Sequence, residues 1–186
     1  MSKSVRRKYI RSVVQGILKD LHVDSAPVRV DKIIEKFNIE VLYQSGADNL
    51  SGFLLRDKNE GRVIIGVNNN HSAARRKFTL AHELGHFLLH EAEEIHVDDD
   101  KEKKNLLINR RDDDAALGIY VKEREANLFA AELLMPEFLI QKELKEQGQN
   151  IHLLNDDELS PIAKKLEVSV QALTYRLSNL GYIWAW

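Results

Sequence analysis

A pair of histidines four residues apart, inside a long amphipathic stretch, is the feature of this sequence that most restricts its fold. His82 and His86 stand in the order His-Glu-Leu-Gly-His, with Glu83 between them. On a helix, residues at this spacing are about 40° apart around the axis and about 6 Å apart along it, so both imidazoles can reach one point. Ser72 is suited to cap such a helix, which we expect to continue to about Glu91. The fold therefore has to leave one face of this helix accessible to a metal ion.

The same spacing predicts zinc chemistry with a general base. Bound zinc lowers the pKa of a water molecule to about 7, and Glu83 can take the proton of that water as it attacks a carbonyl. The bare pattern recurs by chance in roughly one chain per hundred, and a structural polar face is the alternative interpretation. Gly85 supports the metal site, because a glycine that costs about 1 kcal/mol in a helix interior suggests that another backbone approaches closely there.

The third ligand is sought downstream, since catalytic zinc sites use three protein ligands and a water. Helical phase favours Glu123, near the start of a helix predicted over 122–135. Asn127, one turn later, could accept a hydrogen bond from the outer nitrogen of a zinc-binding histidine. Glu125 points elsewhere on that helix, and we expect it to be solvated, although it stays the alternative ligand. His90 lies about two turns beyond His82 and is too distant to close the site.

The composition excludes several kinds of site and partner. The 186 residues are 44% hydrophobic and 30% charged, which suits one packed domain with at most a small appendage. There is no cysteine, so disulfides, thiolate metal sites and cysteine nucleophiles are excluded. A histidine and carboxylate set suits Zn²⁺ but also admits Mn²⁺ or Fe²⁺. The formal net charge of −2 gives no overall attraction to nucleic acid.

The hydropathy pattern predicts a cytoplasmic location. The first residues are basic, but Arg11, Gln15 and Lys19 interrupt the apolar run that a signal peptide requires. No stretch approaches about 18 apolar residues, so we expect neither a membrane span nor a membrane partner.

The order of periodic segments predicts an α+β fold. Helical spacing marks residues 3–21 and a short helix near 30–37, and alternation indicates strands at 39–43, 50–55 and 62–67. A charge-rich segment at about 93–116 is expected to be an exposed insertion. We predict one domain over residues 1–148 that contains this insertion, followed by a C-terminal helical segment over 149–186.

The C-terminal segment is similar to a helix-turn-helix over residues 160–181. A first helix is expected to start at Ser160-Pro161, and Val168-Ser169 forms the turn. The second helix offers polar side chains that could contact a DNA groove, namely Gln171, Thr174, Arg176 and Asn179. Few basic residues are available for phosphate contacts, so docking onto the core or onto a protein partner is the preferred interpretation. Trp184 and Trp186 suggest a packed C-terminus.

Two long runs, Arg76–His86 and Glu123–Pro136, resemble the ImmA/IrrE metallopeptidase family, and so do the strand segments 50–53 and 64–68. The resemblance covers roughly residues 27–140. It implies a zincin-like fold, in which helices pack on a small three-stranded mixed or antiparallel sheet. It also implies that His82, His86 and Glu123 bind zinc and that Glu83 is the general base.

The resemblance further implies a substrate class. Family members cleave helix-turn-helix transcriptional repressors and so release genes of stress responses or mobile elements. The alternative function is a non-enzymatic regulator or a toxin–antitoxin component that binds DNA or a repressor. A substrate could add to an exposed edge of strands 50–55 or 62–67. Candidates for stabilising the oxyanion are Tyr120, His90, Arg75 and Arg76.

Overall fold

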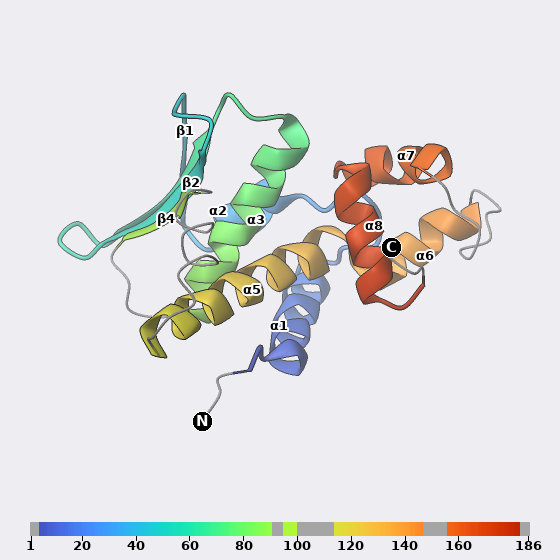
Figure 1. The fold of residues 1–186 in the computed structure, drawn as a ribbon, viewed down its shortest axis with the longest axis horizontal. Coiled ribbons are helices and arrows are strands. Elements are labelled where there is room, and N and C mark those ends of the chain that lie inside the picture. Colours follow the sequence, from blue (N-terminus) through green and yellow to red (C-terminus); the bar gives the residue numbers. More distant parts are fainter. Residues whose placement is uncertain (1–3, 91–94, 100–113, 147–155, 183–186) are drawn as a thin grey trace.

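The computed structural model describes residues 4–90, 95–99, 114–146 and 156–182. Figure 1 shows a sheet at one end, two C-terminal helices at the other, and two long crossing helices between them. The helices are α1 (Arg7–Asp20), α2 (Val30–Lys36), α3 (Ala73–Leu89), α5 (Asp114–Leu134), α6 (Glu137–Glu146), α7 (Asp156–Leu166) and α8 (Val170–Asn179). The predicted α+β class is confirmed.

The sheet has one strand more than the sequence predicted. Its strands are β1 (Glu40–Gln44), β2 (Leu50–Asp57), β3 (Arg62–Asn68) and β4 (Ile95–Asp99), in the order β1-β3-β2-β4. β1 runs parallel to β3, whereas β2 pairs antiparallel with both β3 and β4. The three predicted strands are present. β4 was missed because its alternating pattern is only a few residues long and lies inside the charge-rich segment 93–116.

The predicted insertion falls partly outside the described residues. Of the segment 93–116, the structure describes β4 and the first turn of α5, which begins at Asp114 and so earlier than expected. The first C-terminal helix also begins earlier than Ser160, since α7 starts at Asp156 and contains Pro161 in its second turn. Acidic residues in the first turn favour this start because they interact with the helix dipole. Trp184 and Trp186 lie outside the described residues.

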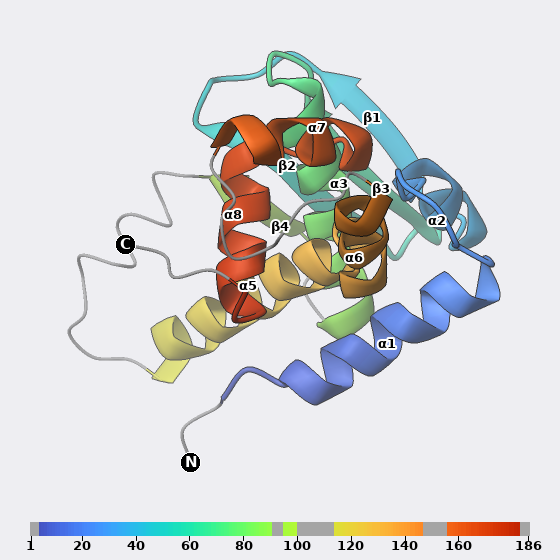
Figure 2. The ribbon, with the colours of Figure 1, turned by 90° about the vertical axis from the view of Figure 1, so that its right-hand side faces the viewer.

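A continuous apolar core connects the elements around α3 and α5. Buried side chains from α1, the sheet, α3, α5 and the C-terminal helices belong to one cluster. α3 lies against β2 and β3, α5 crosses α3, and α1 packs on α5. Figures 1 and 2 show α3 between the sheet and the C-terminal helices, with α5 crossing it. This arrangement turns one face of α3 toward α5. The division into 1–148 and 149–186 stays a prediction.

Candidate metal centre

Three potential metal ligands from α3 and α5 converge at the crossing of these helices. His82 and His86 approach each other through their Nε2 atoms at 3.1 Å. An oxygen of Glu123 lies 3.0 Å from Nε2 of His86, and the other oxygen lies 3.6 Å from Nε2 of His82. Ligand atoms of all three residues lie within 4.8 Å of one another. Two imidazole nitrogens and one carboxylate directed at one point form a donor set that suits a divalent transition metal.

Local sequence explains how α3 presents the two histidines. The side chain of Ser72 caps the helix by accepting a hydrogen bond from the backbone nitrogen of Arg75 at 3.3 Å. This cap agrees with the sequence prediction and fixes the helical phase. From that start, positions 82 and 86 fall on one face, which is turned toward α5.

Gly85 allows α5 to approach α3 closely. A Cβ atom at Gly85 would lie 3.1 Å from the ring of Phe129 and 3.2 Å from Cα of Ala126, which is tighter than ordinary van der Waals contact. The structure therefore confirms the expectation that another backbone lies against this glycine. The same approach carries Glu123, one turn before Ala126, to the two histidines.

Outer hydrogen bonds orient both imidazoles. Nδ1 of His82 lies 3.0 Å from Oδ1 of Asn127, as predicted for that amide. Nδ1 of His86 lies 3.1 Å from Nδ1 of His90. A proton on each Nδ1 lets His82 donate to Asn127 and His86 donate to His90, an assignment that follows from the network. Both Nε2 lone pairs are then directed at the position between the two histidines and Glu123.

The series of hydrogen bonds that starts at His86 continues through His90 to Glu125 and Arg6. Nε2 of His90 lies 3.1 Å from Oε2 of Glu125 and can donate to it. Glu125 also accepts from the backbone nitrogen of Arg6 at 2.8 Å and from its guanidinium. His90 thus lies outside the ligand cluster, on the far side of His86. Burial lowers the pKa of His90, although the bond to Glu125 opposes this.

The expectation that Glu125 is solvated is wrong. Its exposed fraction is 2%, because α1 and its leading segment cover this face of α5. Burial alone would raise the pKa of Glu125, but hydrogen bonds from Arg6 and His90 lower it to about 2. The carboxylate is therefore engaged as the charged acceptor for Arg6 and His90. Sequence reasoning missed Arg6, whose only signal was its place in a basic N-terminal segment.

Glu83 is fully buried and directed toward strand β2. Its exposed fraction is 0%. A Cβ atom at Gly52 of β2 would lie 3.8 Å from Oε1 of Glu83 and 2.5 Å from Cγ2 of Thr79. Glycine at position 52 therefore lets β2 lie directly against the helical turn that carries Glu83. The carboxylate is held between helix and sheet, and in the sequence Glu83 directly follows His82.

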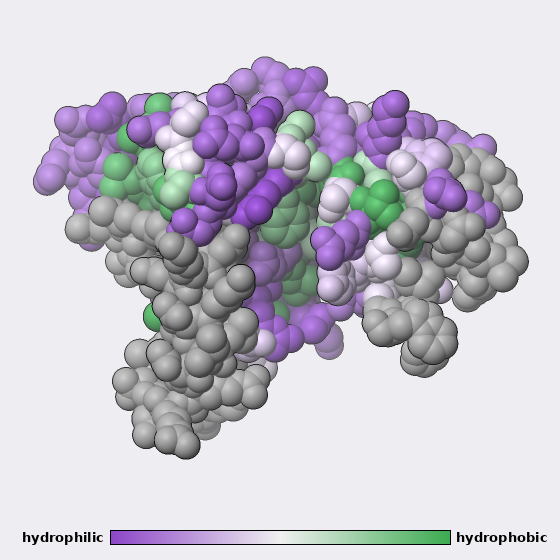
Figure 3. Space-filling view, turned by 45° about the horizontal axis from the view of Figure 1, so that its top comes forward, coloured by the Kyte–Doolittle hydropathy of each residue, from purple (hydrophilic) through white to green (hydrophobic). Residues whose placement is uncertain are grey.

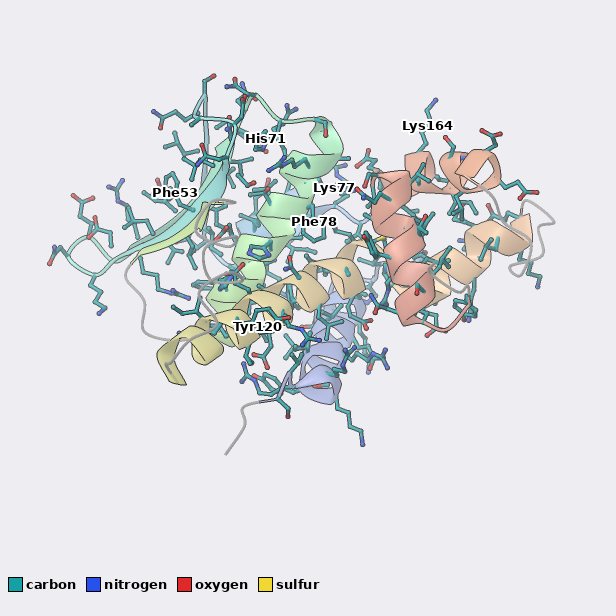
Figure 4. The ribbon with its side chains drawn as sticks, in the orientation of Figure 1. Phe53, His71, Lys77, Phe78, Tyr120 and Lys164 are labelled. Atoms are coloured by element: carbon teal, nitrogen blue, oxygen red, sulfur yellow. The ribbon has the colours of Figure 1, made fainter. Side chains whose placement is uncertain are left out.

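The four candidates for oxyanion stabilisation have different surroundings. Arg75 donates to Oγ of Ser51 at 2.8 Å, and Arg76 donates to a backbone carbonyl of the loop before α3. His90 faces the Nδ1 side of His86, so it is directed away from the ligand cluster. Tyr120 comes from α5, one turn before Glu123, and is exposed (Figure 4).

The predicted substrate edges are wrong for both strands. β3 lies between β1 and β2, and β2 lies between β3 and β4, so neither strand is an edge of the sheet. The missed strand β4 covers β2 and forms the edge on that side. An extended segment that adds to the sheet there would have to pair with β4.

The C-terminal helices are docked onto α5 by a buried ion pair. Arg176 has an exposed fraction of 2% and donates to both oxygens of Glu132, at 2.9 and 2.7 Å, and to the carbonyl of Met135. Arg11 binds the same carboxylate from α1. Arg176 was one of the side chains that could have contacted a DNA groove; instead its guanidinium is bound inside the protein. Lys77 of α3 reaches the end of α7 and binds the carbonyl of Leu166 (Figure 4).

No helix within the described ranges is both long and apolar enough to cross a membrane.

Comparison with known proteins extends the observations on the fold and the ligand cluster. The chain is 29% identical, over 148 residues, to the uncharacterized immunity region protein 2 of Bacillus phage phi105, covering 80% of this chain and 78% of that protein. Its structure resembles that of a Mycobacterium tuberculosis transcriptional regulator, with a TM-score of 0.60 and 13% identity. That alignment covers 92% of this chain but 46% of the regulator, so this likeness concerns the fold alone.

A family model gives the decisive match. The model described as the IrrE N-terminal-like domain, Peptidase_M78, matches residues 34–178. The match includes α3 and α5 with the whole ligand cluster, and it agrees with the ImmA/IrrE resemblance of the sequence. The chain therefore belongs to the Peptidase_M78 family.

Proposed function

We propose that this chain is a zinc-dependent endopeptidase that cleaves a cytoplasmic regulatory protein, namely a helix-turn-helix transcriptional repressor. The single observation that carries the proposal is the convergence of His82, His86 and Glu123, with Glu83 on the same helix. Membership of a peptidase family supports it. A module that only binds a partner has no use for a buried carboxylate beside a metal-ligand cluster.

The proposed ligands are His82 and His86 through Nε2, and Glu123 through a carboxylate oxygen. A bound zinc ion supplies Lewis acidity, which lowers the pKa of water and polarises the substrate carbonyl. Glu83 acts as general base by accepting a proton from the attacking water, and it then delivers that proton to the leaving amine. Its burial between α3 and β2 restricts the positions that the carboxylate can take.

The remaining residues of the site hold these groups in place. Asn127 and His90 accept from the outer nitrogens of the two histidines, which fixes the ring orientation and keeps each Nε2 available as a ligand. Glu125 and Arg6 hold His90 in turn. Such outer partners are worth about 10- to 100-fold in metal affinity.

The repressor substrate is supported by the comparisons. The phage phi105 relative is described as a protein of an immunity region. That setting fits a peptidase that removes a repressor and so derepresses genes of a mobile element or of a stress response. A purely DNA-binding role is less well supported, since Arg176 of α8 is buried against Glu132.

A Glu83→Gln variant tests the proposal. It should bind zinc with the stoichiometry of the native chain, because glutamine preserves size and the ligands are untouched. It should also retain a protein partner from lysate without cutting it, and the native chain should then cleave that purified partner. Cleavage by Glu83→Gln at the native rate would contradict the assigned role of Glu83. Recovery of DNA alone, with no cleavable protein, would favour the binding alternative.

A further inference from the structure

A cavity lies between α5 and α8, beside the ligand cluster. Its volume is about 640 Å³, within the usual range for a binding site. The start of α3 closes one part of it, and the segment at Val5 and Arg7 lines another. Figure 3 shows the molecule hollowed on this side, with apolar residues inside the hollow and polar residues around it. We call this cavity the α5–α8 groove.

Two residues that line the groove contact the candidate metal ligand His82. Phe78 lines it and stacks on His82, with ring centroids 6.5 Å apart and an interplanar angle of 29°. Asn127 also lines it and accepts from Nδ1 of His82. Phe78 projects from α3 toward the C-terminal helices (Figure 4). A molecule in the groove therefore lies one side chain away from the proposed reaction centre.

The charged side chains that line the described part of the groove are all positive. Among the residues that the structure describes, its lining contains four arginines and neither aspartate nor glutamate. Arg176 is neutralised by Glu132 and Arg75 donates to Ser51, which leaves Arg7 and Arg124. In the described part of the chain no carboxylate pairs with Arg7 or Arg124, and the Arg124 guanidinium lies 5.5 Å from the centre of the Tyr120 ring. The chain as a whole carries a net charge of −2, so this basic lining is a local feature.

The floor of the groove is apolar. Leu128 and Ala131 of α5 line it together with Met135, which directly follows α5, and with Ala172 of α8. Such a floor favours aliphatic side chains, whose burial removes apolar surface from water. Arginines at the rim and an apolar floor match a peptide that carries both acidic and aliphatic side chains.

We propose that the α5–α8 groove binds an acidic amphipathic segment of the protein substrate and so delivers the adjoining peptide bond to the metal centre. This rests on the proposed peptidase function and adds the substrate's chemistry to it. Carboxylates of the segment pair with Arg7 and Arg124, and its aliphatic side chains lie on Leu128 and Ala131. Duplex DNA is a poorer match, because the groove lies between two packed helices whereas reading DNA needs a helix that protrudes.

Binding is tested with the full chain carrying Glu83→Gln, so that no hydrolysis is required. The probes are a fluorescent peptide of leucine, alanine and glutamate, the same peptide with lysine in place of each glutamate, and duplex DNA. Fluorescence anisotropy should show binding of the acidic peptide and not of the lysine peptide. Arg7→Gln with Arg124→Gln should raise its Kd about tenfold, since each exposed pair contributes a factor of up to about five.

The matched control is Arg29→Gln with Arg62→Gln, which changes the net charge equally at exposed sites outside the groove. It should leave the Kd within a factor of about two at moderate salt, where distant surface charges are screened. Equal weakening by both double variants would overturn the proposal, as would binding of DNA in preference to the acidic peptide. Because this assay needs no cleavage, a negative result with an active native peptidase refutes the groove alone. Intact peptide binding with an inactive native chain refutes the peptidase function alone.

Discussion

Replacing Gly85 by alanine tests whether the close approach of α3 and α5 builds the metal centre. Alanine removes the cost of glycine in a helix interior, which favours folding by about 1 kcal/mol. The new methyl group would lie 3.1 Å from Phe129 and 3.2 Å from Cα of Ala126, so the helices have to separate by a few tenths of an ångström. Overpacking of this kind costs about 1–3 kcal/mol. The packing cost therefore matches or exceeds the helical gain.

Gly16 provides the matched control. It lies in the exposed face of α1, and a Cβ atom there would meet nothing within 4 Å. Gly16→Ala should stabilise the chain by about 1 kcal/mol, whereas Gly85→Ala should be neutral or destabilising by up to about 2 kcal/mol. Urea unfolding of both variants measures the difference, which we expect to be about 1–3 kcal/mol.

Measuring the zinc affinity of both variants distinguishes an effect on the metal site from an effect on helix packing alone. Moving α5 away from α3 also moves Glu123 away from the two histidines, so Gly85→Ala should weaken zinc binding in a chelator competition assay. Gly16→Ala should leave the zinc affinity unchanged. If Gly85→Ala stabilises the chain as much as Gly16→Ala and binds zinc as tightly, the close-approach argument is refuted.

Three other predictions concern the carboxylates and the outer histidine. Glu132→Ala leaves the buried Arg176 without its main partner and should lower the unfolding free energy by about 3–5 kcal/mol in urea; a loss below about 1 kcal/mol would contradict the docking role. Burial alone would raise the pKa of Glu132, but hydrogen bonds from Arg176 and Arg11 lower it by more, so its pKa in the folded protein lies below 4.5. The stabilisation that ionised Glu132 gives is therefore present above pH 4.5 and is lost as the pH falls through the lower folded pKa. The unfolding temperatures of native and Glu132→Gln chains should consequently converge in acid. His90→Phe should weaken zinc binding about 10- to 100-fold while keeping full occupancy at saturating zinc, whereas Glu123→Gln should bind zinc still more weakly.

The helical part of the site could be predicted because it depends on local sequence. The cap at Ser72 and the spacing of His82 and His86 determine their phase without reference to the rest of the chain. Gly85 was informative for the same reason, since a glycine inside a helix is unfavourable unless something packs on it. Phase on the second helix was enough to bring Glu123 rather than Glu125 to the histidines.

The contacts between distant segments could not be predicted. Arg6 and Glu125 are 119 positions apart, and neither residue differs locally from a solvated surface charge. The partner of Arg176 is 44 positions away, so the sequence left open whether its guanidinium contacts DNA or packs inside the protein. β4 depends on the free edge of β2, which the alternation of a few residues in a charged segment does not reveal.

A crystal structure of the zinc-loaded chain, with anomalous diffraction measured at the zinc edge, tests the central claim most directly. We predict one strong anomalous peak bound by Nε2 of His82, Nε2 of His86 and an oxygen of Glu123, at the usual distances of about 2.0–2.2 Å. Zinc bound instead by His90 and Glu125, or no peak near the crossing of α3 and α5, would contradict the assignment of the metal centre.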